Sequence, residues 1–401
     1  MTQVLSGVQV VEVADWGFVP SAATVLGDWG AEVIKIEHPR YGDPIRGLVT
    51  GGMIPGASGR NFFVEQLGRN KRSVGIDLGH ADGRRILDRL VARADVFLTS
   101  FLDAARARLR LRWEDLRPVN PRLVYARGHG QGRRGPDAGR GGYDAVSFWS
   151  RGGIADRYSA PDQPPLQQRP AFGDFIGGMA LAGGVAAALF RRERSGEGGE
   201  VDVSLLGTAM WVLSPDIVAA LMYGFMLPSA GLMPPAPNPL VGTYPCADGK
   251  GLVLMMLQAE RFWPLFARTI GRPDLLERWA TPQARVEQAA AIRVELAACF
   301  ATRPRADWEA MLRESECIWG PVQTPLELPD DPQVQANGYL LESPHADGPV
   351  RVCANPVQFD GAPPGVRSPA AEVGAHTEDV LLALGYDWDD IGRLKELGVV
   401  S

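Results

Sequence analysis

The sequence predicts an α/β protein with a large domain around a doubly wound parallel sheet and a smaller α+β domain. Two observations carry this prediction. Strand and helix signals alternate through the first part of the chain, and a proline-rich stretch near residue 230 separates them from a block of different character. Strands separated by single helices pair in parallel, because the helix returns the chain to the same end of the sheet.

The elements of the large domain follow from hydrophobic periodicity. A β-branched run predicts the first strand, and a stripe of Ile86, Leu87, Leu90 and Val91 predicts a helix. The expected strands are 8–13, 32–37, 73–78, 95–99, 122–126 and 199–206, and the expected helices are 20–29, 81–94 and 174–193.

The domain boundaries come from the change in composition. We expect residues 1–227 to form the first part of the large domain, 228–239 (PSAGLMPPAPNP) a linker, 240–330 the small domain, and 331–401 a return segment. The small domain should hold a strand at 251–256 and helices at 259–270, 284–301 and 305–316. The return segment should hold strands at 350–353 and 357–359 and helices at 376–384 and 388–397.

Composition excludes several classes of protein. The net charge of −6 gives no basic field for nucleic acid. The four cysteines form no CxxC pair, which fits a reducing compartment. No signal peptide is evident, and the longest apolar run, 179–190, is shorter than the roughly 20 residues that span a bilayer. We therefore expect a cytoplasmic protein with no membrane partner.

Common catalytic motifs are weak or missing. GQGRRG at 130–135 matches a dinucleotide fingerprint, but Pro136 and further glycines continue the loop where a helix should begin. The five histidines have no metal-ligand spacing, so no metal site is expected, and no G-x-S-x-G elbow occurs. His376, just before a helix, fits a capping or buried hydrogen-bonded role.

Asp174, in FGDFIGG, is the candidate catalytic residue. An aspartate before an apolar helix is an ordinary N-cap, and that role is compatible with chemistry. A helix N-terminus should keep the carboxylate ionised at pH 7, and Gly173, Gly177 and Gly178 would let a bulky ligand approach. An ionised carboxylate among free N–H groups can attack an acyl carbon.

Motifs along nearly the whole chain resemble one family. NKRSVGIDL, NPRLVYARGHGQGRRGP, FGDFIGGMA and GPVQTPLELPDDPQV, in this order, resemble the class III CoA-transferases, the CaiB/BaiF family that includes formyl-CoA transferase. The resemblance implies a Rossmann-like domain whose sheet is built from both chain ends, and an interlocked homodimer. It also implies an enzyme that uses coenzyme A as substrate, with no permanently bound cofactor.

The resemblance assigns roles to particular residues. Asp174 occupies the position of the nucleophile, which would form an aspartyl anhydride and then an aspartyl-CoA thioester. The positions that would contact CoA are Gly17, Phe18, His38, Ile76, Asp77, Leu78, Gly79, Ser100, Phe101, Arg108, Gly141, Gly142, Tyr143 and Asp144. Arg108 suits the nucleotide phosphates, although a solvated surface arginine is the alternative.

Departures from the family pattern bear on substrate and mechanism. Phe18-Val19 stands where the family has Ala-Gly, and residues 233–242 lack the glycine-run loop of formyl-CoA transferase. We therefore expect a larger or more apolar acyl group than oxalate or formate. One alternative is an α-methylacyl-CoA racemase, but Tyr143 replaces its histidine and is a poor base at neutral pH. The other is a non-catalytic CoA-binding protein of the same fold.

Overall fold

The computed structural model describes residues 3–54, 59–160, 162–228 and 236–401. The chain forms two compact units, one of residues 1–231 and 336–401, the other of residues 232–335. The expected small domain was 240–330, and residues 229–235 of the expected linker fall outside the described parts of the chain.

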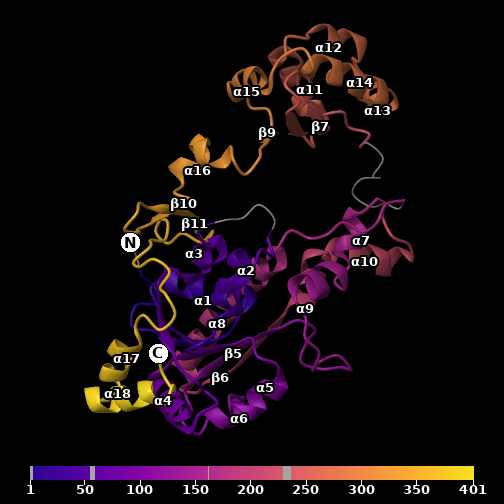
Figure 1. Ribbon diagram of the computed structural model, residues 1–401. Helices are drawn as coiled ribbons and strands as arrows, with labels where there is room; N and C mark the ends of the chain where they lie inside the picture. The colour runs from indigo at the N-terminus through magenta and orange to yellow at the C-terminus, as the bar shows by residue number, and fades with distance from the viewer. Residues whose placement is uncertain (1–2, 55–58, 161, 229–235) are drawn as a thin grey trace. The chain divides into compact units, whose positions relative to one another are not determined.

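The larger unit is organised around a six-stranded parallel sheet, which confirms the predicted α/β class (Figure 1). The strand order is β3-β2-β1-β4-β5-β6, so the order reverses between β1 and β4. Val10 of β1 pairs with Val33 of β2 on one side and with Val96 of β4 on the other. The strands are β1 (Gln9–Val13), β2 (Glu32–Glu37), β3 (Lys71–Gly75), β4 (Val96–Thr99), β5 (Val124–His129) and β6 (Gly199–Ser204).

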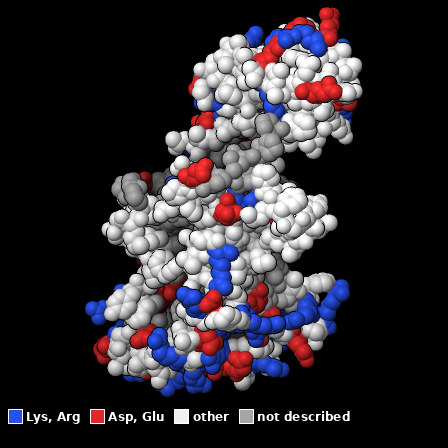
Figure 2. Space-filling model, turned by 90° about the vertical axis from the view of Figure 1, so that its right-hand side faces the viewer, with Lys and Arg blue, Asp and Glu red and all other residues white. Residues whose placement is uncertain are grey.

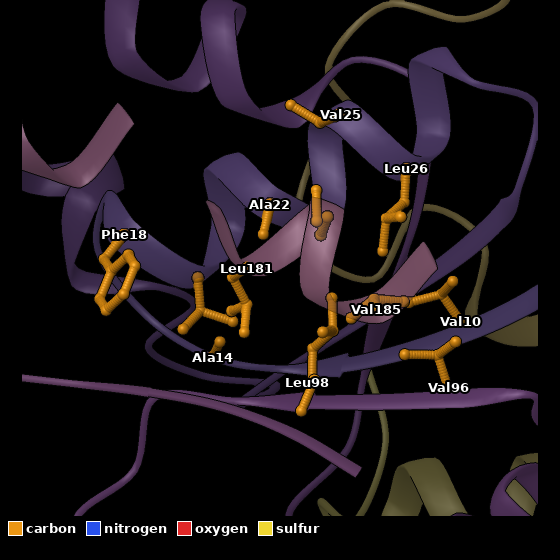
Figure 3. Close-up of a cluster of buried hydrophobic side chains, with 14 of the residues drawn as sticks. Val10, Ala14, Phe18, Ala22, Val25, Leu26, Val96, Leu98, Leu181 and Val185 are labelled. Atoms are coloured by element: carbon orange, nitrogen blue, oxygen red, sulfur yellow. The ribbon is translucent and has the colours of Figure 1, made fainter. Parts of the chain in front are cut away.

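Helices cover both faces of this sheet, and alternate strand residues supply a core on each side. On one face Val10 and Leu98 pack against α1 and α8, where Leu181 and Val185 complete the core (Figure 3). The helices of this unit before the small unit are α1 (Phe18–Asp28), α2 (Gly47–Thr50), α3 (Phe62–Gly68), α4 (Ala81–Arg93), α5 (Asp103–Arg108), α6 (Trp113–Leu116), α7 (Ile154–Tyr158), α8 (Phe172–Ser195), α9 (Leu205–Val212) and α10 (Ser214–Tyr223).

The return segment completes the unit but not its sheet, so the expectation of a sheet built from both chain ends is wrong. All six strands lie within residues 9–204. The later strands β10 (Leu340–Ser343) and β11 (Val350–Cys353) pair with each other as an antiparallel hairpin. They form a separate two-stranded sheet and do not extend the parallel one. Helices α17 (Thr377–Ala383) and α18 (Trp388–Glu396) contribute buried residues to the second core.

The smaller unit holds a three-stranded antiparallel sheet and five helices among its described residues. The strands are β7 (Val241–Pro245), β8 (Gly251–Met255) and β9 (Trp319–Val322), and the helices are α11 (Ala259–Thr269), α12 (Asp274–Arg278), α13 (Pro282–Glu287), α14 (Ala289–Phe300) and α15 (Arg305–Arg313). The helix expected at 284–301 is thus two helices. A short helix α16 (Pro332–Ala336) follows at the boundary between the units.

Helix α8 (Phe172–Ser195) is longer than the apolar run at 179–190 that lies within it. It has 24 residues and is apolar enough, by length and composition, to cross a membrane, and α9 with α10 passes the same test as a pair bent by 69°. A helix in the core of a domain has the same composition. The buried Leu181 and Val185 of α8 belong to the core beneath α1, so its composition is explained by packing.

Candidate functional site

Several of the predicted contact positions follow the carboxyl ends of strands of the parallel sheet. Gly17 follows β1, His38 follows β2, and Ser100 follows β4. The Ser100 hydroxyl accepts a hydrogen bond from the Asp15 backbone N–H at 3.0 Å, which joins the loops after β1 and β4 where the strand order reverses. Ligands of open α/β sheets bind in such a crevice, so this edge is the candidate site.

Asp174 lies in the first turn of α8, but it is not the N-cap. Ala171 holds the N-cap position with a left-handed backbone, φ 66°. The N-terminus is capped by a residue distant in sequence, because both carboxylate oxygens of Asp144 accept from the Gly173 N–H at 3.1 Å. The expectation that Asp174 caps its own helix is therefore wrong, and its carboxylate is left for another role.

The Asp174 carboxylate lies against Gly17, at the start of α1. A Cβ atom at position 17 would come within 2.4 Å of Asp174 Oδ2, so a side chain there would have to displace the carboxylate. One turn further along α1, the Ser21 hydroxyl contacts the Asp174 carbonyl oxygen at 3.1 Å. Two helices thus begin at the carboxylate, and the missing side chain of Gly17 makes room for it.

The environment of Asp174 favours its neutral form. Burial, and then the negative charge of Asp144, raise the pKa of Asp174 from 3.8 to about 8. We expected the helix N-terminus to keep Asp174 ionised at pH 7, and this is wrong because burial of its carboxyl group, and then the charge of Asp144, raise its pKa instead. Asp174 is therefore a carboxyl group with a strongly raised pKa at the edge of the sheet, which marks it as a candidate functional residue.

The Phe18 side chain does not occupy the space beside the Asp174 carboxylate. It is buried in the core between α1, α8 and the sheet (Figure 3). Cβ atoms at Gly128 and Gly177 would lie 2.8 Å and 2.7 Å from the Phe18 ring, so these glycines create the space that the ring occupies. The larger residue is thus accommodated away from the carboxylate.

The positions after β2 and β3 differ in how much surface they present. The His38 ring is exposed and lies 4.6 Å from that of Tyr41. Ile76 is buried in the core, and its backbone bridges to Val400. Asp77 and Leu78 are partly buried and Gly79 is exposed, with the Asp77 carboxylate accepting from the Gly79 N–H at 2.8 Å.

The positions after β4 and in the glycine-rich loop also differ in their exposure and in the space around them. Phe101 is partly buried and Arg108 is exposed. A Cβ atom at Gly142 would lie 2.2 Å from Ser147 Oγ, whereas Gly141 has open space. The exposed Tyr143 ring meets the Trp16 ring edge-on, with 5.5 Å between centroids.

Sequence reasoning missed Asp15 and Trp16, which precede Gly17. Burial, with Asp43 next in effect, raises the pKa of Asp15 to about 7. Trp16 has a left-handed backbone, φ 70°, which is unusual for a large residue and marks local strain. The available signal was a charged residue directly after a buried strand, at the edge where parallel sheets bind ligands.

His129, the histidine nearest the glycine-rich loop in sequence, is engaged at both nitrogens. Its Nδ1 accepts from the Gly132 N–H at 2.9 Å, and its Nε2 contacts the Asp202 carboxylate. These two contacts fix the position of the His129 ring. Within residues 3–54, 59–160, 162–228 and 236–401, no three or more His, Cys, Asp or Glu side chains are grouped to hold a metal ion.

Comparison with known proteins identifies the family of the chain. The profile of the family described as CoA-transferase family III matches residues 5–377. The chain belongs to CoA-transferase family III. As a class III CoA-transferase, it transfers CoA between an acyl-CoA and a carboxylic acid, which confirms the predicted enzyme class.

Individual relatives of this family III transferase align over nearly their whole length. It is 33% identical to (R)-2-hydroxy-4-methylpentanoate CoA-transferase of Clostridioides difficile, covering 99% of both chains. It is 31% identical to cinnamoyl-CoA:phenyllactate CoA-transferase of Clostridium sporogenes, covering 98% and 97%. The crystal structure of a CAIB/BAIF family protein from Brucella suis matches with a TM-score of 0.81 and 28% identity, covering 96% of this chain and 100% of that one.

Proposed function

We propose that Asp174 is the nucleophile of CoA transfer and forms covalent intermediates. Its carboxylate attacks the acyl carbon of the donor thioester, the C–S bond breaks, and CoA leaves as the thiolate. The thiolate then attacks the carbonyl carbon of Asp174 in the anhydride, which releases the donor acid as a carboxylate and leaves an aspartyl-CoA thioester. The acceptor carboxylate repeats these steps in reverse order, so the energy of the thioester is conserved.

The observation that carries this proposal is the placement of Asp174 against Gly17 at the carboxyl edge of the sheet. With a pKa of about 8, about a tenth of the carboxyl groups are ionised at pH 7. That fraction is desolvated and poorly stabilised, which increases its nucleophilicity. Attack requires loss of the proton, so transfer should be faster at higher pH.

We place CoA along the carboxyl edge, with its thioester at Asp174. The exposed His38, Gly79 and Arg108 follow β2, β3 and β4 and can meet the nucleotide end of the coenzyme. Arg108 supplies a guanidinium for the phosphates. Acidic side chains lie among the basic ones on the face in Figure 2, so this face presents no continuous basic surface for a nucleic acid.

The substrate class in this proposal is an apolar monocarboxylic acid. The names of two relatives specify 2-hydroxy-4-methylpentanoate, cinnamoyl-CoA and phenyllactate, which carry branched or aromatic hydrocarbon groups. The sequence also lacks the glycine-run loop expected for oxalate or formate.

The proposal includes a cytoplasmic homodimer. Large apolar side chains of α9, α10 and the turn after them are exposed, with Trp211 79% and Leu221 80% accessible. A second copy of the chain would remove such a surface from water. The four cysteines are unpaired, as expected in a reducing compartment. Sedimentation at micromolar concentration should give twice the mass of one chain.

The experiment that tests the proposed role of Asp174 compares transfer with binding. Asp174→Asn and Asp174→Ala should each lower the transfer rate at least about 1,000-fold, because the covalent route is lost. Calorimetry should show that both variants still bind CoA. Transfer within tenfold of the wild-type rate in Asp174→Asn would refute the nucleophile.

A further inference from the structure

The return segment covers the outer edge of the parallel sheet. Strand β3 is the last in the strand order, so β2 takes only one of its two edges, and its outer backbone groups need other partners. The Ser73 carbonyl oxygen accepts from the His376 N–H at 2.9 Å, and the Ser73 N–H donates to His376 Nδ1 at 3.2 Å. The Gly75 N–H donates to Thr377 Oγ1 at 3.0 Å. Residues at the start of α17 thus take the place of a further strand.

Residues 399–401 continue this cover beyond the end of β3. The Asp77 N–H donates to the Val399 carbonyl oxygen at 2.8 Å, and Val400 forms an antiparallel bridge with Ile76. The side chains of Val399 and Val400 belong to the second core and are 1% and 3% exposed. These residues are therefore held firmly beside the loop that follows β3.

Asp77 connects them to this loop, residues 76–79. Its N–H is bound by Val399, and its own carboxylate accepts from the Gly79 N–H at 2.8 Å. Its carbonyl oxygen accepts from the N–H of His80, the N-cap of α4, at 3.2 Å. The backbone of the loop thus takes its shape from a residue whose own N–H is fixed by the return segment.

Two glycines make room for the Ser401 side chain. Cβ atoms at Gly75 and Gly374 would lie 2.0 Å and 1.9 Å from Ser401 Oγ, so the hydroxyl takes the space that those side chains would need. Gly75 ends β3, and Gly374 lies shortly before α17. A much larger side chain at position 401 cannot occupy the same place, and it would move the segment away from β3.

We propose that residues 399–401 position the loop 76–79 for coenzyme A. The inference rests on the proposed placement of the nucleotide end of CoA at this edge, and it adds the element that fixes the shape of the loop. A loop already held in its bound conformation loses less freedom on binding, so it binds more tightly. The nucleotide end does not react, so a weaker contact there affects substrate and transition state equally, and KM rises while kcat stays unchanged.

The test compares a variant that lacks residues 399–401 with Val380→Ala, a control in the same core on α17. The donor is 3-phenylpropanoyl-CoA and the acceptor is 4-methylpentanoate. The truncated variant should raise the donor KM about fivefold to tenfold, as expected for one lost backbone hydrogen bond, with kcat and the acceptor KM within about twofold. Val380→Ala should lower the melting temperature and leave both KM values unchanged. A fall in kcat with an unchanged donor KM in the truncated variant would overturn the inference.

A point variant decides the matter if the truncated chain does not fold. Ser401→Trp should raise the donor KM about threefold and speed hydrogen exchange at the Asp77 amide. Glu396→Trp, which places the same side chain on the exposed surface of α18, should change neither. Equal donor KM values in these two variants would refute the positioning role. If the wild type neither binds CoA by calorimetry nor transfers it from any ester, the proposed function itself fails.

Discussion

Replacing Asp174 with asparagine should make the protein more stable while it destroys activity. The pKa of Asp174 is raised from 3.8 to about 8 in the folded protein, so folding favours the protonated form. Ionisation of Asp174 therefore lowers the free energy of unfolding. This loss of stability is absent below about pH 4, grows as the pH rises, and reaches its full size above about pH 8. Asparagine removes this cost.

The magnitude follows from the gap between the two pKa values. About three pH units separate 3.8 from pH 7, and each unit corresponds to about 1.4 kcal/mol, so the upper limit at pH 7 is about 4 kcal/mol. Burial raises this pKa, but part of the Asp174 side chain remains accessible to solvent, which reduces the cost, so we expect a gain of about 1–3 kcal/mol for Asp174→Asn at pH 7.

Urea unfolding at pH 5, 7 and 9 measures this gain. The advantage of Asp174→Asn should be smallest at pH 5 and largest at pH 9. Asp28→Asn is the matched control, because Asp28 is a buried carboxylate bound to Arg69, and its loss should destabilise the protein by about 3 kcal/mol. An Asp174→Asn protein that is less stable than wild type at pH 9 would refute the assigned environment.

Three further predictions concern the same carboxylate. The kcat/KM of transfer should rise with pH to a plateau with a midpoint near pH 8, and a flat profile between pH 6 and 9 would contradict the pKa of Asp174. Gly17→Ala should lower kcat/KM about 100-fold with an unchanged melting temperature, since its Cβ would displace Oδ2; normal activity would show that the contact is not needed. Asp144→Ala should cost about 1 kcal/mol in urea unfolding and move the activity midpoint to lower pH; a midpoint that stays near pH 8 would exclude Asp144 as a cause.

Local patterns predicted the parallel sheet well. Strands β1 and β4 are short, mostly apolar runs that fit a sheet buried on both faces, whereas β2, β3, β5 and β6 include charged residues and were indicated by their β-branched residues and by their places between helices. The return segment was harder, because its strand signals are as short as those of the sheet. Only the pairing of Leu340 with Cys353 shows that β10 and β11 form their own hairpin.

Contacts between distant residues explain what the sequence could not reveal at the site. Asp174 was found from its glycine-rich surroundings, but its cap, Asp144, lies 30 positions earlier and comes close only in the fold. The space for Phe18 is likewise shared between Gly128 and Gly177, on different elements. Periodicity and capping statistics describe neighbours in sequence, so they assigned Asp174 the role that Asp144 fills.

Mass spectrometry of the protein incubated with an acyl-CoA tests the central claim most directly. The peptide that contains Asp174 should gain the mass of CoA less one water, and hydroxylamine should convert this thioester to a hydroxamate at Asp174. Asp174→Asn should carry no adduct. Turnover in wild-type protein without any covalent adduct under rapid quenching, or an adduct that persists in Asp174→Asn, would contradict the account.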